Sequence, residues 1–310
     1  MATTATPSSF RLPGYSIAVG PFSHLAAERD RLSALAWRHF DATPLGSTVG
    51  AEISGVDLSA PLPDDVVTEL RQALYDYKVI FFRDQPLSPP QHVAFARRFG
   101  DLEIHPFLPS NTGEAELVRF EKTAEVSGYE NSWHHDVTWR ACPSMGAILH
   151  AVSVPERGGD TLFADMYAAY AALDDATKAQ IDDLVAVHDF TQTFGHTMSA
   201  DERRAAQERY PPVEHPVVCT HPGTGRPHLY VNRPFVSHIV GMDAVESRDL
   251  LDLLCRQTDS PEHQCRFTWS TDAVAFWDNR AVQHYASSDY WPQRRTMERA
   301  SIVGPLPVRT

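Results

Sequence analysis

The sequence lacks any apolar run long enough to cross a membrane. Its longer apolar stretches, such as Val79–Phe82 and Ala147–Val154, have the length of β-strands, whereas a membrane-spanning helix needs roughly 20 apolar residues. The segment Met1–Phe10 also lacks the basic residues and the apolar stretch of a secretory signal. We therefore expect a cytoplasmic protein that has no membrane partner.

Cysteine and positive charge are also scarce. The four cysteines show no C-x-x-C spacing, so neither a zinc knuckle nor a disulfide scaffold is indicated, and we expect reduced, buried thiols. The 27 Lys and Arg residues are outnumbered by 40 Asp and Glu, which gives a net charge of −13. Because a nucleic-acid partner normally requires a basic face, we expect none, and an anionic ligand would need a few arginines that converge locally.

The 310 residues are enough for one substantial core. Residues 1–42 are predicted to be an N-terminal extension, because the first twenty are rich in Thr, Ser and Pro and show no sustained period. Within this extension, Ala26–Phe40 could form a short amphipathic helix. No internal repeat follows, so residues 43–310 are predicted to form a single domain.

Three later segments carry clear helix signals. Asp64–Tyr77 has apolar residues at helical spacing. Ser88 precedes two prolines and predicts a helix that ends at Gly100. Asp243–Gln257 is the third predicted helix.

Short β-type runs fill much of the remaining sequence. Many short strands, separated by Gly and Pro and interrupted by helical inserts, favour a mainly-β jelly roll or β-sandwich over βαβ units. The predicted strands are Val79–Phe82, Ala147–Val152, Thr161–Phe163, Pro216–Thr220, His228–Val231, Ala273–Trp277 and Ala300–Val303. The segments Phe107–Ser132 and Gly195–Pro211 are long, polar and poorly periodic, so we expect loops there that close over a ligand.

The strongest local motif is Trp133-His134-His135-Asp136. In an extended segment, residues i and i+2 point to the same face, so His134 and Asp136 can converge on one point while His135 turns away. Two such ligands and a remote histidine would form a 2-His-1-carboxylate metal site, which leaves coordination positions open for a cosubstrate and O2. An isolated H-x-D motif arises easily by chance, so its meaning depends on the residues downstream.

The downstream residues supply that context. They are Gly158-Gly159-Asp160-Thr161, Trp277-Asp278-Asn279-Arg280 leading to His284, and then Arg295 and Arg299. These residues and their spacing resemble the taurine dioxygenase/TfdA family of Fe(II)- and 2-oxoglutarate-dependent dioxygenases. Segments beyond the ligands, such as Gly50–Leu58 and Gly146–Leu149, fall in the order of that family. The resemblance extends from Pro44 to Pro307.

The resemblance implies a fold and a set of residue roles. The fold would be a distorted double-stranded β-helix, a relative of the jelly roll and cupin folds. His134, Asp136 and His284 would bind Fe(II). Arg295 would form a salt bridge with the distal carboxylate of 2-oxoglutarate, a pairing that suits the fork of a guanidinium group. Thr161 would donate its hydroxyl hydrogen to the same carboxylate.

The resemblance also implies a reaction. The enzyme would hydroxylate a C–H bond of a small anionic substrate with O2 and 2-oxoglutarate as cosubstrates, and would release succinate and CO2. Hydroxylation next to a sulfo group would lead to release of sulfite or sulfate. Halogenation is not expected, because Asp136 keeps the carboxylate that halogenases of this superfamily lack. Family members commonly form homo-oligomers, so a dimer or tetramer is expected.

The resemblance assigns the substrate pocket as well. His105 and Arg299 match the positions that grip the sulfonate of taurine. Phe194 and Phe235 match aromatic wall positions, and Val137 matches a small apolar contact. Outside this resemblance, plain core packing would account equally well for the two phenylalanines.

Two substitutions separate this sequence from the taurine enzymes. Leu108 stands where they carry a tyrosine, and Glu130 replaces an asparagine, although Asn131 follows it and could take over that role. These positions recognise the amine of taurine. The predicted substrate is therefore a small anion, either a sulfonate such as taurine, an alkyl sulfate or a carboxylate.

Two other classes of function account for the sequence less well. A zinc-type hydrolase on the same fold would leave Thr161 and Arg295 unexplained, because hydrolysis needs no bound keto acid. A binding module without activity would have no use for a complete set of metal and cosubstrate residues. Both alternatives are therefore much weaker than a dioxygenase.

The remaining polar residues of interest are expected to have structural roles. His135 is predicted to lie beside the metal site or at the surface, and Asp278 and Asn279 are predicted to position His284. Four further histidines are predicted to be hydrogen-bonded parts of the core. They are His150, His188, His215 and His221.

Overall fold

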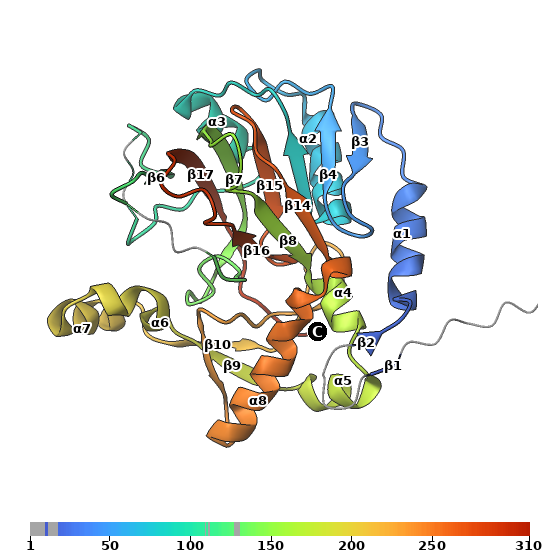
Figure 1. Ribbon diagram of the computed structural model, residues 1–310, viewed down its shortest axis with the longest axis vertical. Helices are drawn as coiled ribbons and strands as arrows, with labels where there is room; N and C mark the ends of the chain where they lie inside the picture. Colours follow the sequence, from blue (N-terminus) through green and yellow to red (C-terminus); the bar gives the residue numbers. More distant parts are fainter. Residues whose placement is uncertain (1–9, 12–17, 109, 111, 127–130) are drawn as a thin grey trace, which may run out of the picture.

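The structure is a computed structural model that describes residues 10–11, 18–108, 110, 112–126 and 131–310. Its centre is a seven-stranded sheet with the order β3-β4-β5-β15-β7-β17-β6, seen in the upper half of Figure 1. Neighbouring strands are antiparallel except for β4 and β5. In that order the strands are Asp41–Pro44, Ala51–Ser54, Val79–Phe82, Val274–Asp278, Ser144–Ser153, Arg295–Val303 and Leu117–Lys122.

A smaller antiparallel sheet, β14-β8-β16, packs against one face of the large sheet. Phe81 of β5 is stacked on Phe267 of β14, with 4.1 Å between the ring centroids, and both belong to the buried core that the two sheets share. The smaller sheet consists of β14 (Gln264–Phe267), β8 (Thr161–Asp165) and β16 (Val282–Ala286). These facing sheets confirm the predicted mainly-β fold of the jelly-roll type.

Helices α2 (Asp64–Tyr77) and α3 (Pro89–Arg97) cover the other face of the large sheet (Figure 1). Strand β5 lies between the two layers. Its residues Val79 and Phe81 belong to the core between the sheets, whereas Ile80 and Phe82 belong to the core beneath the helices. Because both faces of the strand are covered, an uninterrupted apolar sequence is needed there.

The three strongest helix predictions are confirmed. Helix α2 has the predicted bounds. Helix α3 begins after Ser88, which forms a capping box, but it ends at Arg97, before the predicted Gly100. Helix α8 (Ala244–Cys255) begins after Asp243, whose side chain accepts hydrogen bonds from the first turn.

A further group of strands and helices lies in the lower half of Figure 1. It contains a sheet of order β10-β9-β13 and a two-stranded sheet β11-β12, and β1 and β2 form a separate pair. None of the described helices is long and apolar enough to span a membrane. The strands are β1 (Phe10–Arg11), β2 (Ala18–Val19), β9 (Val185–His188), β10 (Val213–Pro216), β11 (Val218–Thr220), β12 (Pro227–Leu229) and β13 (Val236–Ile239). The further helices are α4 (Met166–Ala171), α5 (Asp175–Ile181), α6 (Thr191–Phe194) and α7 (Ala200–Arg209), with 3₁₀ turns at Ser23–Leu25, Gly195–Thr197, Arg256–Asp259 and Pro261–His263.

The two loop predictions are wrong in part. Gly195–Pro211 contains helix α7, whose start is fixed by a capping box between Ser199 and Glu202. Phe107–Ser132 contains strand β6, and positions 109, 111 and 127–130 of that segment lie outside the described residues. Every predicted strand overlaps an observed one, but Pro216–Thr220 is split between β10 and β11.

Helix α1 is anchored to the sheets by a buried ion cluster. It spans Ala26–Ser33, shorter than the predicted Ala26–Phe40. Its Glu28 accepts a hydrogen bond of 2.8 Å from the ammonium group of Lys78, which is fully buried and lies 3.3 Å from Asp165. Burial alone would raise the pKa of Glu28, but hydrogen bonds from Arg31 and the charge of Lys78 hold that pKa well below its usual range.

We predict that Lys78→Met lowers the free energy of unfolding by about 3–5 kcal/mol, because it leaves the buried carboxylate of Asp165 without its cation. Urea unfolding followed by circular dichroism measures this change. The matched control is Arg97→Ala, which breaks an ion pair with Glu116 in which the arginine is 59% exposed, and there a loss of about 0–1 kcal/mol is expected. Equal losses in the two variants would contradict the anchoring role of the buried cluster.

Candidate active site

Backbone pairing brings the two candidate histidine ligands together. His134 forms an isolated antiparallel bridge with His284 of β16, through hydrogen bonds of 3.1 Å and 2.9 Å between their main chains. Directly opposed residues of this kind place their side chains close to each other, and here the ring centroids are 4.1 Å apart. The strand β16 that carries His284 was not among the predicted elements.

Asp136 reaches the site by a different route from the one predicted. It lies in a turn, not in an extended strand, and Val137 after it has a φ of 48°. The turn is held by Asn279, whose side chain accepts a hydrogen bond from the Asp136 N–H (2.7 Å) and donates to its carbonyl (3.0 Å) and to Ser144 (3.1 Å). The expectation that Asn279 positions His284 is therefore corrected, because its side chain bonds the Asp136 backbone.

The three side chains have the geometry of a cation site. The Nε2 atoms of His134 and His284 each lie 4.0 Å from an oxygen of Asp136, and one ligand atom from each residue lies within 4.8 Å of the others. His134 donates from Nδ1 to the Ser132 carbonyl (2.8 Å), so its Nε2 lone pair faces the site. Among the described residues, the buried Oδ2 of Asp136 has no hydrogen-bond partner. This donor set fits a divalent metal ion.

The protonation states also suit a metal. Burial alone would raise the pKa of Asp136, but the nearby charge of Arg299 lowers it to about 2. Arg299 donates from Nη1 to Asp136 Oδ1 at 2.7 Å. Burial and the neighbouring His134 lower the pKa of His284 to about 3. The carboxylate is therefore ionised and the His284 imidazole is neutral at physiological pH, as metal ligands must be.

A pocket beside the triad contains the two predicted cosubstrate residues. Thr161, Arg295, His134 and His284 all line it. Thr161 accepts a hydrogen bond from the indole N–H of Trp269 (3.0 Å), which leaves the hydroxyl hydrogen of Thr161 available to a ligand.

The guanidinium group of Arg295 is packed between aromatic rings. Its central carbon lies 6.0 Å from the ring centroid of Trp269 and 5.8 Å from that of Tyr290. A Cβ atom on Gly159 would lie 3.2 Å from Arg295 and from Tyr290, and Gly159 has a φ of 70°. The second glycine of the Gly158-Gly159 pair is therefore needed for the backbone to turn beside Arg295.

A second pocket shares His134 and Arg299 with the first. Its lining includes the predicted residues His105, Val137, Phe194 and Phe235, together with Leu108 and Trp139. Asn131 is exposed and does not line it, whereas Ser132 does, and Glu130 lies outside the described residues. The anion-gripping and apolar residues of the prediction are therefore brought together, and Asn131 is not placed with them.

His105 is poised as a hydrogen-bond donor toward this second pocket. Its Nδ1 accepts hydrogen bonds from the main-chain N–H groups of Phe107 (3.2 Å) and Leu108 (3.1 Å). Burial, together with the positive charge of Arg299, lowers the pKa of His105 to about 3. The ring is therefore neutral and carries its hydrogen on Nε2, where it can bond an anion.

Aromatic residues that the sequence did not reveal pack against the residues that line the second pocket. Phe107 lies with its ring centroid 5.4 Å from Trp139, 5.2 Å from Phe190 and 5.4 Å from Phe194. These residues form one buried cluster with Phe235. The sequence signal was the local density of aromatic residues in segments that lack a period, but such density does not indicate which rings meet.

The structural histidines are as predicted, with one correction. All four are buried and hydrogen-bonded. His188 bonds Thr138 and His221 bonds Asp278. His215 bonds the Thr138 and Arg140 carbonyls, and His150 bonds Asp272. His135 is fully buried beside the Tyr230 ring, with 4.9 Å between centroids. A surface position for His135 is therefore wrong.

A jelly-roll-type fold that brings two histidines and one carboxylate together beside two pockets is typical of 2-His-1-carboxylate metalloenzymes. Comparison with known proteins specifies the class further. The model of the TauD, TfdA family of taurine catabolism dioxygenases matches residues 41–301. The chain belongs to this family and is an α-ketoglutarate (2-oxoglutarate)-dependent dioxygenase.

Curated relatives extend over most of the chain. The alkylsulfatase of Acinetobacter baylyi is 35% identical over 271 residues, which cover 84% of this chain and 84% of that protein. The α-ketoglutarate-dependent sulfate ester dioxygenase of Pseudomonas putida is 35% identical and covers 86% of this chain, with 91% of its own length matched. The α-ketoglutarate-dependent 2,4-dichlorophenoxyacetate dioxygenase of Cupriavidus pinatubonensis is 33% identical, and the match covers 84% of this chain and 97% of that protein.

Solved structures agree with the fold. A taurine dioxygenase from Burkholderia xenovorans is 36% identical, with a TM-score of 0.77 over 88% of this chain and 92% of that chain. The structure of AAD-2 in complex with Mn(II) and N-oxalylglycine is 32% identical, with a TM-score of 0.76 over 87% of this chain and 100% of that chain.

We predict that Asn279→Ala weakens metal binding by about 10- to 100-fold, the usual effect of removing a group that orients a metal ligand. Titration of the protein with Mn²⁺ in a calorimeter measures this change. Asn232→Ala is the control, because Asn232 is another buried asparagine, bonded to Thr138 and Phe235. An unchanged affinity in Asn279→Ala would show that the turn at Asp136 holds its shape without the amide.

Proposed function

We propose that this dioxygenase hydroxylates an alkyl sulfate or alkyl sulfonate that carries an apolar tail. Fe(II) would be held by His134, Asp136 and His284, and 2-oxoglutarate by Thr161 and Arg295. The observation that carries the proposal is the pair of adjoining pockets, which share His134 and Arg299. One pocket offers a guanidinium group and a hydroxyl, and the other offers an anion site next to an aromatic wall.

The residues present fit the metal and the cosubstrate. The bare Asp136 Oδ2 and the imidazoles of His134 and His284 match the ligands that Fe(II) takes in this class. When bound, Fe(II) and 2-oxoglutarate supply the oxidising power for C–H hydroxylation, with O2 consumed and succinate and CO2 released. Arg295 is 8% exposed, so its pairing with a carboxylate would be shielded from water and strong.

Arg299 would serve both the metal site and the substrate. Its bond to Asp136 Oδ1 fixes that carboxylate and leaves Oδ2 free to face the metal. The same side chain lines the second pocket beside His105. A cationic guanidinium and a neutral imidazole N–H would together grip a sulfate or sulfonate, and the C–H bonds next to that group would then lie near the metal.

Hydroxylation at that position explains how the sulfur group would leave. An alkyl sulfate that is hydroxylated on the carbon bearing the sulfate breaks down to an aldehyde and free sulfate. The equivalent hydroxylated sulfonate breaks down to an aldehyde and sulfite. No further catalytic group is needed for this cleavage. The alkylsulfatase and sulfate ester dioxygenase among the relatives support a sulfate ester as the substrate.

The aromatic wall favours an apolar tail over the amine of taurine. Leu108, Val137, Phe194 and Phe235 line the pocket, and an ammonium group placed against them would lose its hydration without a partner. The same wall supports an aryloxy carboxylate as the second candidate substrate, in line with the phenoxypropionate dioxygenase of Sphingobium herbicidovorans, which is 35% identical.

We predict that anaerobic addition of Fe(II) and 2-oxoglutarate produces the weak visible absorption band of a chelated complex. Arg295→Ala should weaken 2-oxoglutarate binding by about 10- to 100-fold, because it removes charge-assisted hydrogen bonds worth about 1.5–3 kcal/mol. Titration of the band measures the affinity. Arg294→Ala is the control, since that neighbouring arginine is 65% exposed. Absence of the band in the metal-loaded wild type would overturn the proposed function.

We predict that kcat/KM for sulfate release rises about fourfold for each methylene added to a linear alkyl sulfate, until the aromatic wall is covered. This factor corresponds to about 0.8 kcal/mol for each buried CH2 group. Phe194→Ala should flatten the dependence for long chains and leave the shortest ester unaffected, which makes that ester the internal control. Sulfite release from taurine as fast as sulfate release from the best ester would contradict the preference for an apolar tail.

A further inference from the structure

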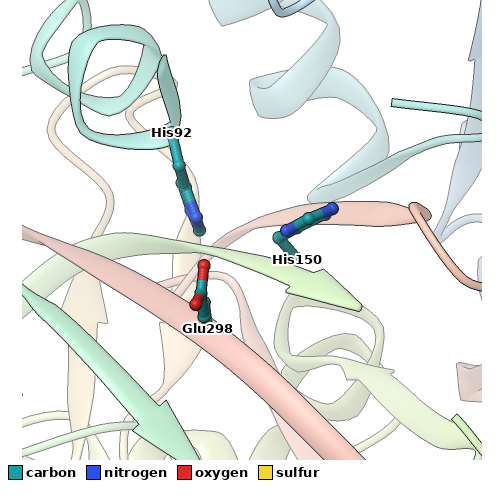
Figure 2. A group of neighbouring side chains, drawn as sticks. All are labelled: His92, His150 and Glu298. Carbon is teal, nitrogen blue, oxygen red and sulfur yellow. The ribbon is translucent and has the colours of Figure 1, made fainter. Parts of the chain in front are cut away.

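A second group of potential metal ligands lies on the far side of the large sheet. His150 on β7 and Glu298 on β17 are directly opposed across the two strands, and His92 of α3 reaches them from above (Figure 2). Their relative exposures are 3%, 1% and 0%. Because side chains alternate along a strand, Glu298 points toward the helices, whereas its neighbour Arg299 lines the catalytic pockets. This cluster is therefore separate from the active site.

Hydrogen bonds fix which nitrogen of each imidazole carries the hydrogen. His92 Nε2 lies 3.0 Å from the Ile148 carbonyl oxygen, and His150 Nε2 lies 3.3 Å from the Asp272 carboxylate. Carbonyl and carboxylate oxygens only accept, so both Nε2 atoms donate and both Nδ1 atoms carry lone pairs. Metal-bound histidines are oriented in this way, with the distal N–H bonded to a carbonyl or carboxylate.

The Nδ1 lone pairs of His92 and His150 are both buried, and no hydrogen-bond donor among the described residues meets either of them. Within the described part of the chain, neither His92 Nδ1 nor His150 Nδ1 has a partner with hydrogen-bond geometry, and the main chain of Gln85 is a further polar neighbour of the His150 ring. Such buried, unsatisfied acceptors are unfavourable unless a ligand or water meets them. Burial and the nearby His150 lower the pKa of His92 to about 3, and burial also lowers the pKa of His150 despite Asp272. Both rings are therefore neutral, the form that binds metal.

The carboxylate of Glu298 is held by Arg119. The Arg119 Nε atom donates to Glu298 Oε1 at 3.0 Å, and Nη2 of the same side chain makes a further contact with that oxygen. The Arg119 side chain is 31% exposed, so it can turn toward solvent if a cation binds the carboxylate. One ligand atom from each of His92, His150 and Glu298 lies within 4.8 Å of the others. Atoms bound to one Zn²⁺ ion lie about 3.4 Å apart for bonds of roughly 2.1 Å, so small side-chain movements would close the site.

We propose that His92, His150 and Glu298 form a second metal site with three protein ligands, and that its ion is Zn²⁺. Two imidazole nitrogens and one carboxylate oxygen suit zinc, and a water molecule completes four-coordination. The ion joins α3 to β7 and β17. Since β17 also carries Arg295 and Arg299, the site braces the strand that presents both arginines to the catalytic pockets.

Zinc binding by a variant without the catalytic ligands tests this proposal. His134→Ala combined with His284→Ala removes the catalytic metal site and leaves the second cluster intact. After loading with zinc sulfate and removal of the excess, elemental analysis should give about one zinc per chain. Addition of His92→Gln or Glu298→Gln should reduce this to a small fraction. Addition of His188→Gln, which changes another buried histidine with a bare ring nitrogen, should leave the zinc bound.

Crystals of the wild-type protein soaked in zinc give a second readout. It uses no variant, so misfolding of a variant cannot affect it. Anomalous scattering at the zinc edge should place one peak between His92, His150 and Glu298. A peak at the catalytic triad alone would overturn the proposal, as would a water that donates to both Nδ1 atoms without an anomalous signal. The result is independent of the absorption band at the catalytic site, so failure of one proposal does not touch the other.

Discussion

The main-chain bridge between His134 and His284 is the interaction on which the catalytic site depends. Two backbone hydrogen bonds join the segment after β6 to strand β16 and set the two imidazoles side by side. Asp136 then needs only to be turned toward them, and the amide of Asn279 does this by bonding its main chain. The two candidate histidine ligands are therefore positioned by peptide groups, which vary less with sequence than side-chain contacts do, whereas Asp136 depends on the side chain of Asn279.

Strand β17 connects this site to the rest of the fold. On one face, Arg295 and Arg299 enter the pockets around the candidate metal. On the other face, Glu298 lies among buried groups beneath α3, close to the core that contains Ala300. Displacement of this strand would therefore move both arginines together. The many partners of β17, with β6 on one side and β7 on the other, resist such a movement.

Local signals made part of the fold and site predictable from the sequence. The apolar period of Asp64–Tyr77 and the apolar run of β5 depend only on neighbouring residues, and both were located correctly. Helix α7 was missed because it is polar on all sides and has no buried residue, so no period marks it. The bond between Asn279 and Asp136 joins positions 143 apart. No local pattern reveals such a pair, and the turn at Asp136 was missed for that reason.

The aromatic wall and the metal site belong to different parts of the chain. Leu108, Phe194 and Phe235 of the wall come from segments outside the two facing sheets, whereas His284, Arg295 and Arg299 come from strands within them. Replacements in the wall can therefore accumulate without moving the reacting centre. Evolution can exchange one organic anion for another on this scaffold while the oxidative chemistry stays constant. Relatives named for sulfate esters and for phenoxy acids, each about one-third identical to this chain, are the outcome expected of such a division.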